Sequence, residues 1–211
     1  KENKHMPSEY YSQSVELGQE FQRNNPKNWA GNDSKNYHNQ IRALIDRYNA
    51  KTVLDYGCGK GRQYTNMVSY GMPHDKVTEP MTFQTRINAE SVYKFDPCVK
   101  QFEIEPVGQK FDAVSCTQVL GSIPDIDMPW LRDKLMSYAT KFVFIGLHKP
   151  DKPVKSKKRM YDPNWVTYPR TIEWYQEQFA DWSGSDLYWW FRDTAHPIND
   201  WYSIDLGGLA E

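Results

Sequence analysis

The chain has 211 residues, of which 39% are apolar, 25% charged and 15% aromatic, and its formal net charge is −1. This length is sufficient for one domain with a core of its own, and the near-zero charge provides no global field that would attract nucleic acid or anionic lipid. Three widely spaced cysteines argue against a disulfide scaffold or a structural zinc site and favour a reducing, cytoplasmic setting, and no apolar run reaches the roughly 20 residues that span a bilayer.

Apolar residues at helical spacing predict two helices in the first part of the chain, and a short apolar run then predicts a buried strand. These elements are expected at residues 14–23, 37–48 and 52–55. Glycines at positions 57, 59 and 61 break the strand, and we expect a helix from residue 62 to residue 70. Residues 1–36 are interpreted as an N-terminal extension or lid before a domain formed by residues 37–211.

After residue 70 a stretch without a clear period, residues 71–90, is expected to be mostly loop. Strands are then expected at residues 91–95, 111–116 and 142–147, helices at 126–140 and 171–179, and a last pair of strands at 187–192 and 201–206. His196 and Pro197 lie in the turn that joins this last pair. The alternation of strands and helices along the chain predicts an α/β fold. We expect a Rossmann-like, doubly wound, mostly parallel sheet with a C-terminal antiparallel strand pair and helices on both faces.

The glycines that follow the first strand form the most informative segment, Val53-Leu54-Asp55-Tyr56-Gly57-Cys58-Gly59-Lys60-Gly61. Glycines permit a tight turn and let a ligand approach without a Cβ clash, and the following helix would aim free N–H groups at that ligand. A phosphate P-loop is excluded because its glycine spacing and Lys-Ser/Thr ending are absent. A dinucleotide fingerprint is disfavoured because the third glycine comes one residue early.

The remaining pattern, Asp-x-Gly-x-Gly-x-Gly between a strand and a helix, resembles the first motif of Rossmann-like (class I) S-adenosylmethionine-dependent methyltransferases. The resemblance covers about residues 40–147 and implies that S-adenosyl-L-methionine is the cofactor. The residues that it assigns to cofactor binding in this segment are Asp55, Gly57, Cys58, Gly59 and Gly61.

In the family that the chain resembles, an acidic residue at the end of the second strand binds both ribose hydroxyls, because a carboxylate can accept two hydrogen bonds from a vicinal diol. Asp96, followed by Pro97, supplies such a residue after the strand at 91–95. Glu79 is the alternative, because it lies closer in sequence to the glycine turn. We favour Asp96, because residues 92–95 form the better strand.

A third similarity to the family begins at Lys110 and includes the turn beside the methionine part of the cofactor and the substrate entrance. The positions that carry over are Cys116, Thr117 and Gln118. Some relatives continue with Val-Leu-Glu-His-Ile-Pro, whereas this chain has Val119-Leu120-Gly121-Ser122-Ile123-Pro124. The resemblance therefore provides no acid/base pair at this turn.

Candidate residues for contact with the methyl acceptor lie in two parts of the chain. His148 follows an apolar strand, and ligands bind at the carboxyl ends of parallel strands, so it is the first candidate for substrate contact or proton removal. A solvent-facing histidine at a strand end is the alternative. Tyr10 and Tyr11 are candidates for closing over the cofactor, with an ordinary surface position as the alternative. The Asp/Asn-Pro-Pro-aromatic signature of enzymes that methylate exocyclic base amines is absent from residues 116–119.

We therefore expect transfer of a methyl group to an oxygen or nitrogen nucleophile of a small molecule. A run of basic residues in a predicted loop or lid, residues 149–169, supports the alternative of an RNA methyltransferase, with Trp165 and Tyr168 available for base stacking. A solvated lid is the simpler interpretation of that run. A binding protein that kept the fold and lost turnover is the non-enzymatic alternative. The basic residues are Lys149, Lys152, Lys155, Lys157, Lys158 and Arg159.

Overall fold

The computed structural model describes residues 6–27, 29–71, 76–148, 170–192 and 201–204. Its centre is a sheet of six strands in the order β2-β1-β3-β4-β5-β6. The strands are β1 (Thr52–Tyr56), β2 (Ser91–Phe95), β3 (Phe111–Thr117), β4 (Ala139–His148), β5 (Asp186–Arg192) and β6 (Trp201–Ile204). The first five strands pair in parallel, and β6 pairs with β5 in the antiparallel direction, with Trp189 opposite Ile204.

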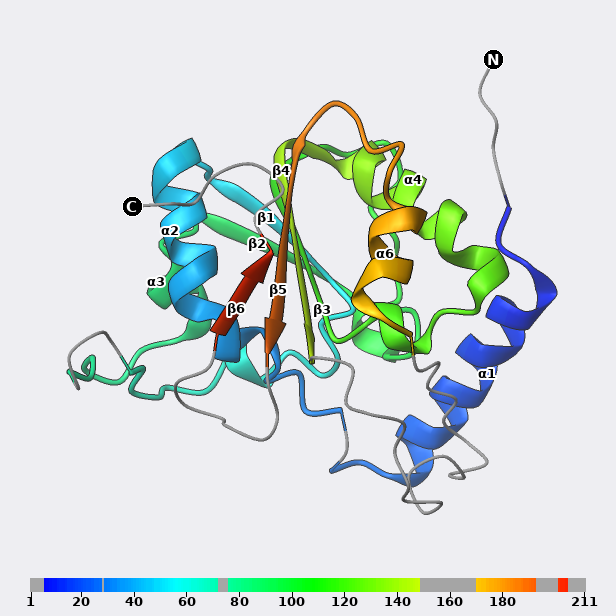
Figure 1. Ribbon diagram of the computed structural model, residues 1–211. Coiled ribbons are helices and arrows are strands. Elements are labelled where there is room, and N and C mark those ends of the chain that lie inside the picture. The colour runs from blue at the N-terminus through cyan, green and yellow to red at the C-terminus, as the bar shows by residue number, and fades with distance from the viewer. Residues whose placement is uncertain (1–5, 28, 72–75, 149–169, 193–200, 205–211) are drawn as a thin grey trace.

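The strand order reverses direction between β1 and β3. From β1 the chain moves outward to β2 and then returns to the other side of β1 to form β3. Open parallel sheets bind ligands outside the carboxyl ends of the strands at such a reversal. These carboxyl ends lie toward the lower edge of Figure 1, where the chain that follows the N-terminal helix α1 (Glu9–Asn24) also passes.

Helices cover both faces of the sheet (Figure 1). Two helices, α2 (His38–Tyr48) and α3 (Phe83–Ile87), lie on one face, and α4 (Met128–Tyr138) and α6 (Ile172–Gln178) lie on the other. The N-terminal helix α1 (Glu9–Asn24) lies beside α4, where the rings of Tyr11 and Trp130 are 4.7 Å apart. None of the described helices is long and apolar enough to cross a membrane.

Side chains that alternate along the central strands build two separate cores. Val114, Val143 and Ile145 belong to the cluster under α4 and α6, whereas Phe142 and Phe144 belong to the cluster under α2. This alternation follows from the two-residue repeat of a strand. Because both faces are covered, the interior of β4 is apolar and all but one residue of β3 are buried. The predicted apolar run at residues 142–147 is therefore the interior of a longer central strand.

The prediction of a helix from residue 62 to residue 70, after the glycine turn, is wrong. Only one turn of 3-10 helix, η2 (Arg62–Tyr64), forms there. The chain then continues as an extended arm in which Val68 bridges Met81 and Gly71 bridges Val77. Hydrogen bonds to distant residues compete with those of a helix. The N–H groups of Arg62 and Gln63 donate to the carbonyls of residues 30 and 31. The side chains of Gln63 and Tyr64 donate to the buried carboxylate of Asp55.

The stretch predicted as mostly loop, residues 71–90, contains the short helix α3. Thr82 caps this helix by accepting the N–H of Thr85, and Phe83 and Ile87 are buried. A single turn of helix is too short to produce a recognisable period, so its stability comes from the cap and the burial. The predicted turn at His196 and Pro197 and the basic residues 149–169 lie outside the described residues.

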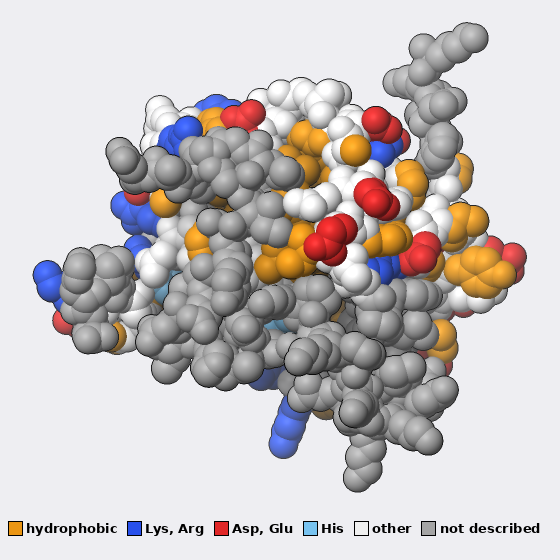
Figure 2. All heavy atoms as spheres, in the orientation of Figure 1, with side chains coloured by type: hydrophobic (Ala, Val, Ile, Leu, Met, Phe, Trp, Pro, Cys, Tyr) orange, Lys and Arg blue, Asp and Glu red, His pale blue; other side chains and the backbone are white. Residues whose placement is uncertain are grey.

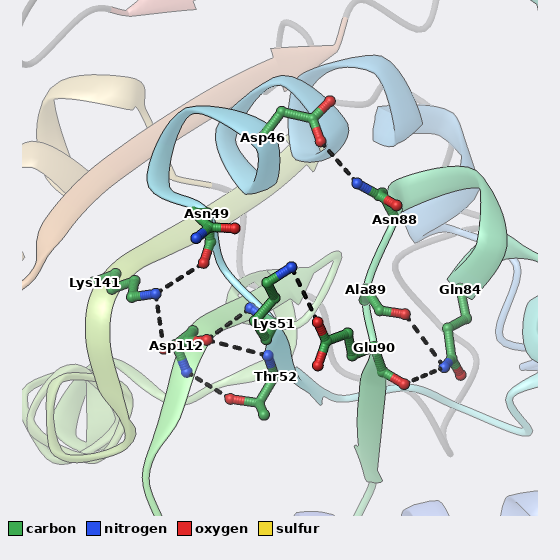
Figure 3. A network of polar contacts seen from close by, with 10 residues as sticks. All are labelled: Asp46, Asn49, Lys51, Thr52, Gln84, Asn88, Ala89, Glu90, Asp112 and Lys141. Carbon is green, nitrogen blue, oxygen red and sulfur yellow. Dashed lines mark hydrogen bonds and ion pairs between the residues drawn. The ribbon is translucent and has the colours of Figure 1, made fainter.

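At the amino ends of the strands a polar network joins β1, β3 and β4 (Figure 3). The carboxylate of Asp112 accepts the N–H groups of Lys51 and Thr52 and lies 3.1 Å from Nζ of Lys141. Burial alone would raise the pKa of Asp112, but these donors outweigh it and hold the pKa below its usual value. The amino ends of the strands are therefore held by structural contacts, and the candidate ligand site is sought at the carboxyl ends.

Candidate functional site

Three chain segments meet at the carboxyl ends of the strands that flank the reversal. Gly57 follows β1, Asp96 follows β2 and Gln118 follows β3. The register places Tyr56 between Phe95 and Cys116 on the neighbouring strands, so the residues that come next emerge side by side. The three motifs identified in the sequence are thus brought to one edge of the sheet.

The backbone of the glycine turn is fully engaged with protein. Every N–H group from residue 57 to residue 63 donates to a protein acceptor at 2.7–3.1 Å. Phe95 accepts two of them, the carboxylate of Asp96 accepts that of Gly59, and the carbonyls of Trp29, Ala30 and Gly31 accept those of Lys60, Arg62 and Gln63. The expectation that free N–H groups point at a ligand is therefore wrong.

The glycines face protein as well. A Cβ on Gly59 would lie 2.9 Å from the carbonyl oxygen of Trp29, and one on Gly57 would lie 2.1 Å from Cγ2 of Val119. A Cβ on Gly61 would lie 3.1 Å from the ring of Phe102. All three glycines have positive φ, which other residues rarely adopt. In this structure the glycines thus provide the backbone conformation and the close approach of neighbouring segments.

Asp96 lies directly after β2 and is 8% exposed. One carboxylate oxygen accepts the N–H of Gly59 at 2.8 Å, and the other accepts the N–H of Cys98 at 2.9 Å. These two bonds lower the pKa of Asp96, but burial has the larger effect and raises the pKa above its usual value. Each carboxylate oxygen has two lone pairs, so each retains one acceptor site for a ligand. Glu79, the alternative, is exposed in the arm after residue 71 and does not end a strand of the sheet.

Asp55, the acidic residue of the glycine motif, is 1% exposed and occupies the centre of a second network. It accepts bonds from the hydroxyl of Tyr64 at 2.6 Å, the amide of Gln63 at 3.1 Å and the hydroxyl of Ser34 at 3.5 Å. Burial raises its pKa to about 6, and the bonds from Tyr64 and Gln63 act in the opposite direction. Ser34 also bonds Thr117 at 2.7 Å, so β1, β3 and the N-terminal segment are joined at this point.

The other residues predicted to bind the cofactor divide between the core and the surface of the site. The side chain of Cys116 is fully buried in the core under α4, and that of Cys58 is 2% exposed, so neither side chain faces a ligand space. Gln118 has φ +59° and is half-buried, and its side-chain amide donates to the hydroxyl of Tyr37 at 2.6 Å. Pro97 accepts a bond from Gln19 of α1 through its carbonyl.

His148 is the last residue of β4 and is exposed. It therefore lies at the same edge of the sheet as the glycine turn. Tyr11 is packed against Trp130, and burial raises its pKa well above the usual value, whereas Tyr10 is 66% exposed. The structure thus places Tyr11 in the packing between α1 and α4.

The sequence analysis missed the part that the N-terminal segment plays. Gly31 has φ +70°, and a Cβ there would lie 2.2 Å from the carbonyl oxygen of Cys58. A Cβ on Gly18 of α1 would lie 2.5 Å from Sγ of Cys98, so α1 packs on the residues that follow Asp96. Gly18 and Gly31 are the sequence signals for these close approaches, whereas the bonds that Trp29, Ala30 and Gly31 accept are made by backbone carbonyls.

The polar groups at the carboxyl edge indicate which kind of ligand it suits. Two buried carboxylates, Asp55 and Asp96, lie at the carboxyl edge, and the N–H groups of the turn are already bonded. A phosphate group requires donors and would not suit this edge. A ligand with hydroxyl and ammonium donors and a positive charge would suit it, and S-adenosylmethionine has all of these features. The residues present therefore fit this cofactor.

A family model described as a methyltransferase domain matches residues 17–195. The chain belongs to this family. It is an S-adenosylmethionine-dependent methyltransferase. The match begins within α1, in keeping with the close packing of this helix on the residues after β2. No curated protein and no solved structure matches the chain.

Proposed function

We propose that this methyltransferase moves the methyl group of S-adenosylmethionine to an oxygen or nitrogen nucleophile of a small molecule at the carboxyl edge of β1, β3 and β4. The observation that supports the cofactor's place most strongly is the pairing of two buried carboxylates with a turn whose N–H groups are all bonded. Such an edge favours a cationic ligand that donates hydrogen bonds. It also lies at the strand reversal, where parallel sheets bind ligands.

In this proposal Asp96 accepts the ribose hydroxyls through its two remaining acceptor sites. Asp55, held by Tyr64 and Gln63, contributes negative potential beneath the glycine turn. Thr117 and Gln118 lie beside the methionine part of the cofactor, as the resemblance to the family implies. When bound, the cofactor supplies an electrophilic methyl group, so the chain's own task is to align the nucleophile and exclude water.

His148 is the proposed proton acceptor, because it is exposed at the end of β4 on the same edge. A base is needed only where the nucleophile carries a proton at the working pH. We therefore expect His148→Gln to lower turnover with a hydroxyl acceptor about 100-fold. Turnover with an unprotonated amine should change little, and the affinity for S-adenosylhomocysteine should not change.

Cofactor analogues test the place of the ribose without altering the protein. Calorimetry with S-adenosylhomocysteine and with its 2′-deoxy and 3′-deoxy analogues measures what each hydroxyl contributes. If Asp96 accepts both hydroxyls, each deletion should weaken binding by about 1–3 kcal/mol. Equal affinity of all three ligands would contradict the assignment of Asp96.

Methyl-donor consumption across a panel of small hydroxyl and amine acceptors then tests the substrate class. The face shown in Figure 2 carries acidic side chains over α4 and α6, where Glu173, Glu177 and Asp181 are exposed. These charges disfavour nucleic acid on that face. Turnover with RNA and none with small molecules would overturn the small-molecule proposal.

A further inference from the structure

We infer that Arg170 is a positioning residue for the cofactor site, acting through the turn that follows β3. The inference rests on the proposed function, because it concerns the wall of the same site. Arg170 belongs to none of the segments that the sequence analysis assigned to the cofactor. It lies one residue before Thr171, the N-cap of α6.

Arg170 is 8% exposed, and its guanidinium group contacts the turn at several points. Nη1 donates to the carbonyl of Leu120 at 2.8 Å, Nη2 donates to the carbonyl of Ile123, and Nε and Nη2 donate to one carboxylate oxygen of Asp125. Its plane lies over the ring of Trp174, with Cζ 4.4 Å from the ring centroid. One side chain thus fixes both ends of the short helix η4 (Leu120–Ser122).

The other side of the turn contacts the glycine motif. Val119 fills the space that a Cβ of Gly57 would occupy. Gln118 stands in the left-handed region with φ +59°, donates its N–H to the carbonyl of Gly146 and binds Tyr37 through its side chain. A non-glycine residue in that conformation persists only where its surroundings hold it. Displacement of the turn would therefore move both Val119 and Gln118 at the cofactor site.

An arginine is needed for this task because its planar fork reaches carbonyls and a carboxylate at the same time. A lysine at this position would keep the charge near Asp125 but would make fewer of these bonds. Arg170 does not itself reach the glycine turn through any bond described above. Its effect on a ligand therefore passes through the turn, and it is a positioning residue.

The experiment compares Arg170→Lys with Arg132→Lys in the full chain. Arg132 is a matched control, because it also pairs with a neighbouring carboxylate, that of Asp133, and donates to a carbonyl, that of Gln178. It joins α4 to the end of α6, and the partners described for it, Asp133, Gln178 and Asp181, lie outside the turn. The readouts are the melting temperature of each variant and the dissociation constant for S-adenosylhomocysteine, measured well below the melting transition.

We expect both variants to melt at lower temperature, and only Arg170→Lys to bind the ligand about tenfold more weakly. Asp125→Asn, whose carboxylate is largely exposed, is a milder change that should also weaken binding and guards against misfolding of the first variant. Wild-type affinity in folded Arg170→Lys, or an equal loss in Arg132→Lys, would overturn the inference and leave the proposed function standing. Absence of binding by the wild-type protein would overturn both.

Discussion

At the scale of single residues, the buried carboxylate of Asp55 makes the protein's stability depend on pH. Burial raises its pKa to about 6 in the folded protein, from an ordinary value near 3.8. Between these values the folded state binds more protons than the unfolded state, so this contribution to stability declines as the pH rises from about 4 to about 6. Above that window the folded protein holds a buried charge.

The variant Asp55→Asn removes this dependence. We expect its free energy of unfolding, relative to wild type, to increase by about 2 kcal/mol between pH 4 and pH 6.5, superimposed on a constant cost for lost hydrogen bonds. Urea unfolding at a series of pH values measures the difference. Asp112→Asn is the control, because the pKa of Asp112 is lowered and its relative stability should be constant in this window. A constant difference for Asp55→Asn would contradict the account.

At the scale of elements, the N-terminal segment and the glycine turn are held together by backbone contacts that leave no room for a Cβ. In Gly31→Ala the new carbon would lie 2.2 Å from the carbonyl of Cys58 and 2.3 Å from the N–H nitrogen of Gly61. Gly108 has a similar φ of +77°, but no described atom lies within 4 Å of its Cβ position. Comparison of the two alanine variants therefore separates the clash from the backbone strain.

We expect Gly108→Ala to cost about 1 kcal/mol of stability, and Gly31→Ala to cost about 1–3 kcal/mol more because of the clash. Only Gly31→Ala should weaken binding of S-adenosylhomocysteine, since it displaces Gly61. Chemical denaturation and calorimetry provide the two measurements. Equal losses in both variants would show that the close contact between the two segments is unimportant.

The elements also show which features a sequence can predict. The strand at Thr52–Tyr56 and the glycine turn were predictable, because a short apolar run followed by spaced glycines has a local cause. The helix after the turn was predicted wrongly, because Gln63 and Tyr64 bind Asp55 and the N–H of Arg62 is taken by Ala30. These partners are distant in sequence, and no local period encodes them.

The same limit applies to the candidate site. Asp96 was predictable as the acidic residue after a strand, and its place opposite the glycine turn agrees with that reasoning. The bonds that its carboxylate accepts from Gly59 and Cys98 were not predictable, because their donors are backbone N–H groups, which every residue type but proline carries. Arg170 was also missed, since its partners are carbonyls of a turn about 50 residues away.

At the scale of the whole molecule, the sheet separates a structural end from a functional end. The network of Asp112 lies at the amino ends of the strands, and the glycine turn lies at the carboxyl ends (Figures 1 and 3). We expect Asp112→Asn to reduce stability by about 1–3 kcal/mol, because charge-assisted bonds to Lys51 and Lys141 are lost. Its affinity for S-adenosylhomocysteine should equal that of wild type, and a parallel loss of affinity would show that the two ends are coupled.

The most direct test of the central claim is a crystal structure of the protein with S-adenosylhomocysteine. The account predicts the ribose against the carboxylate of Asp96, at the carboxyl ends of β1 and β2, with the N–H groups of residues 57–63 still bonded to protein. A ligand at another edge of the sheet, or one held by the N–H groups of the glycine turn, would contradict it.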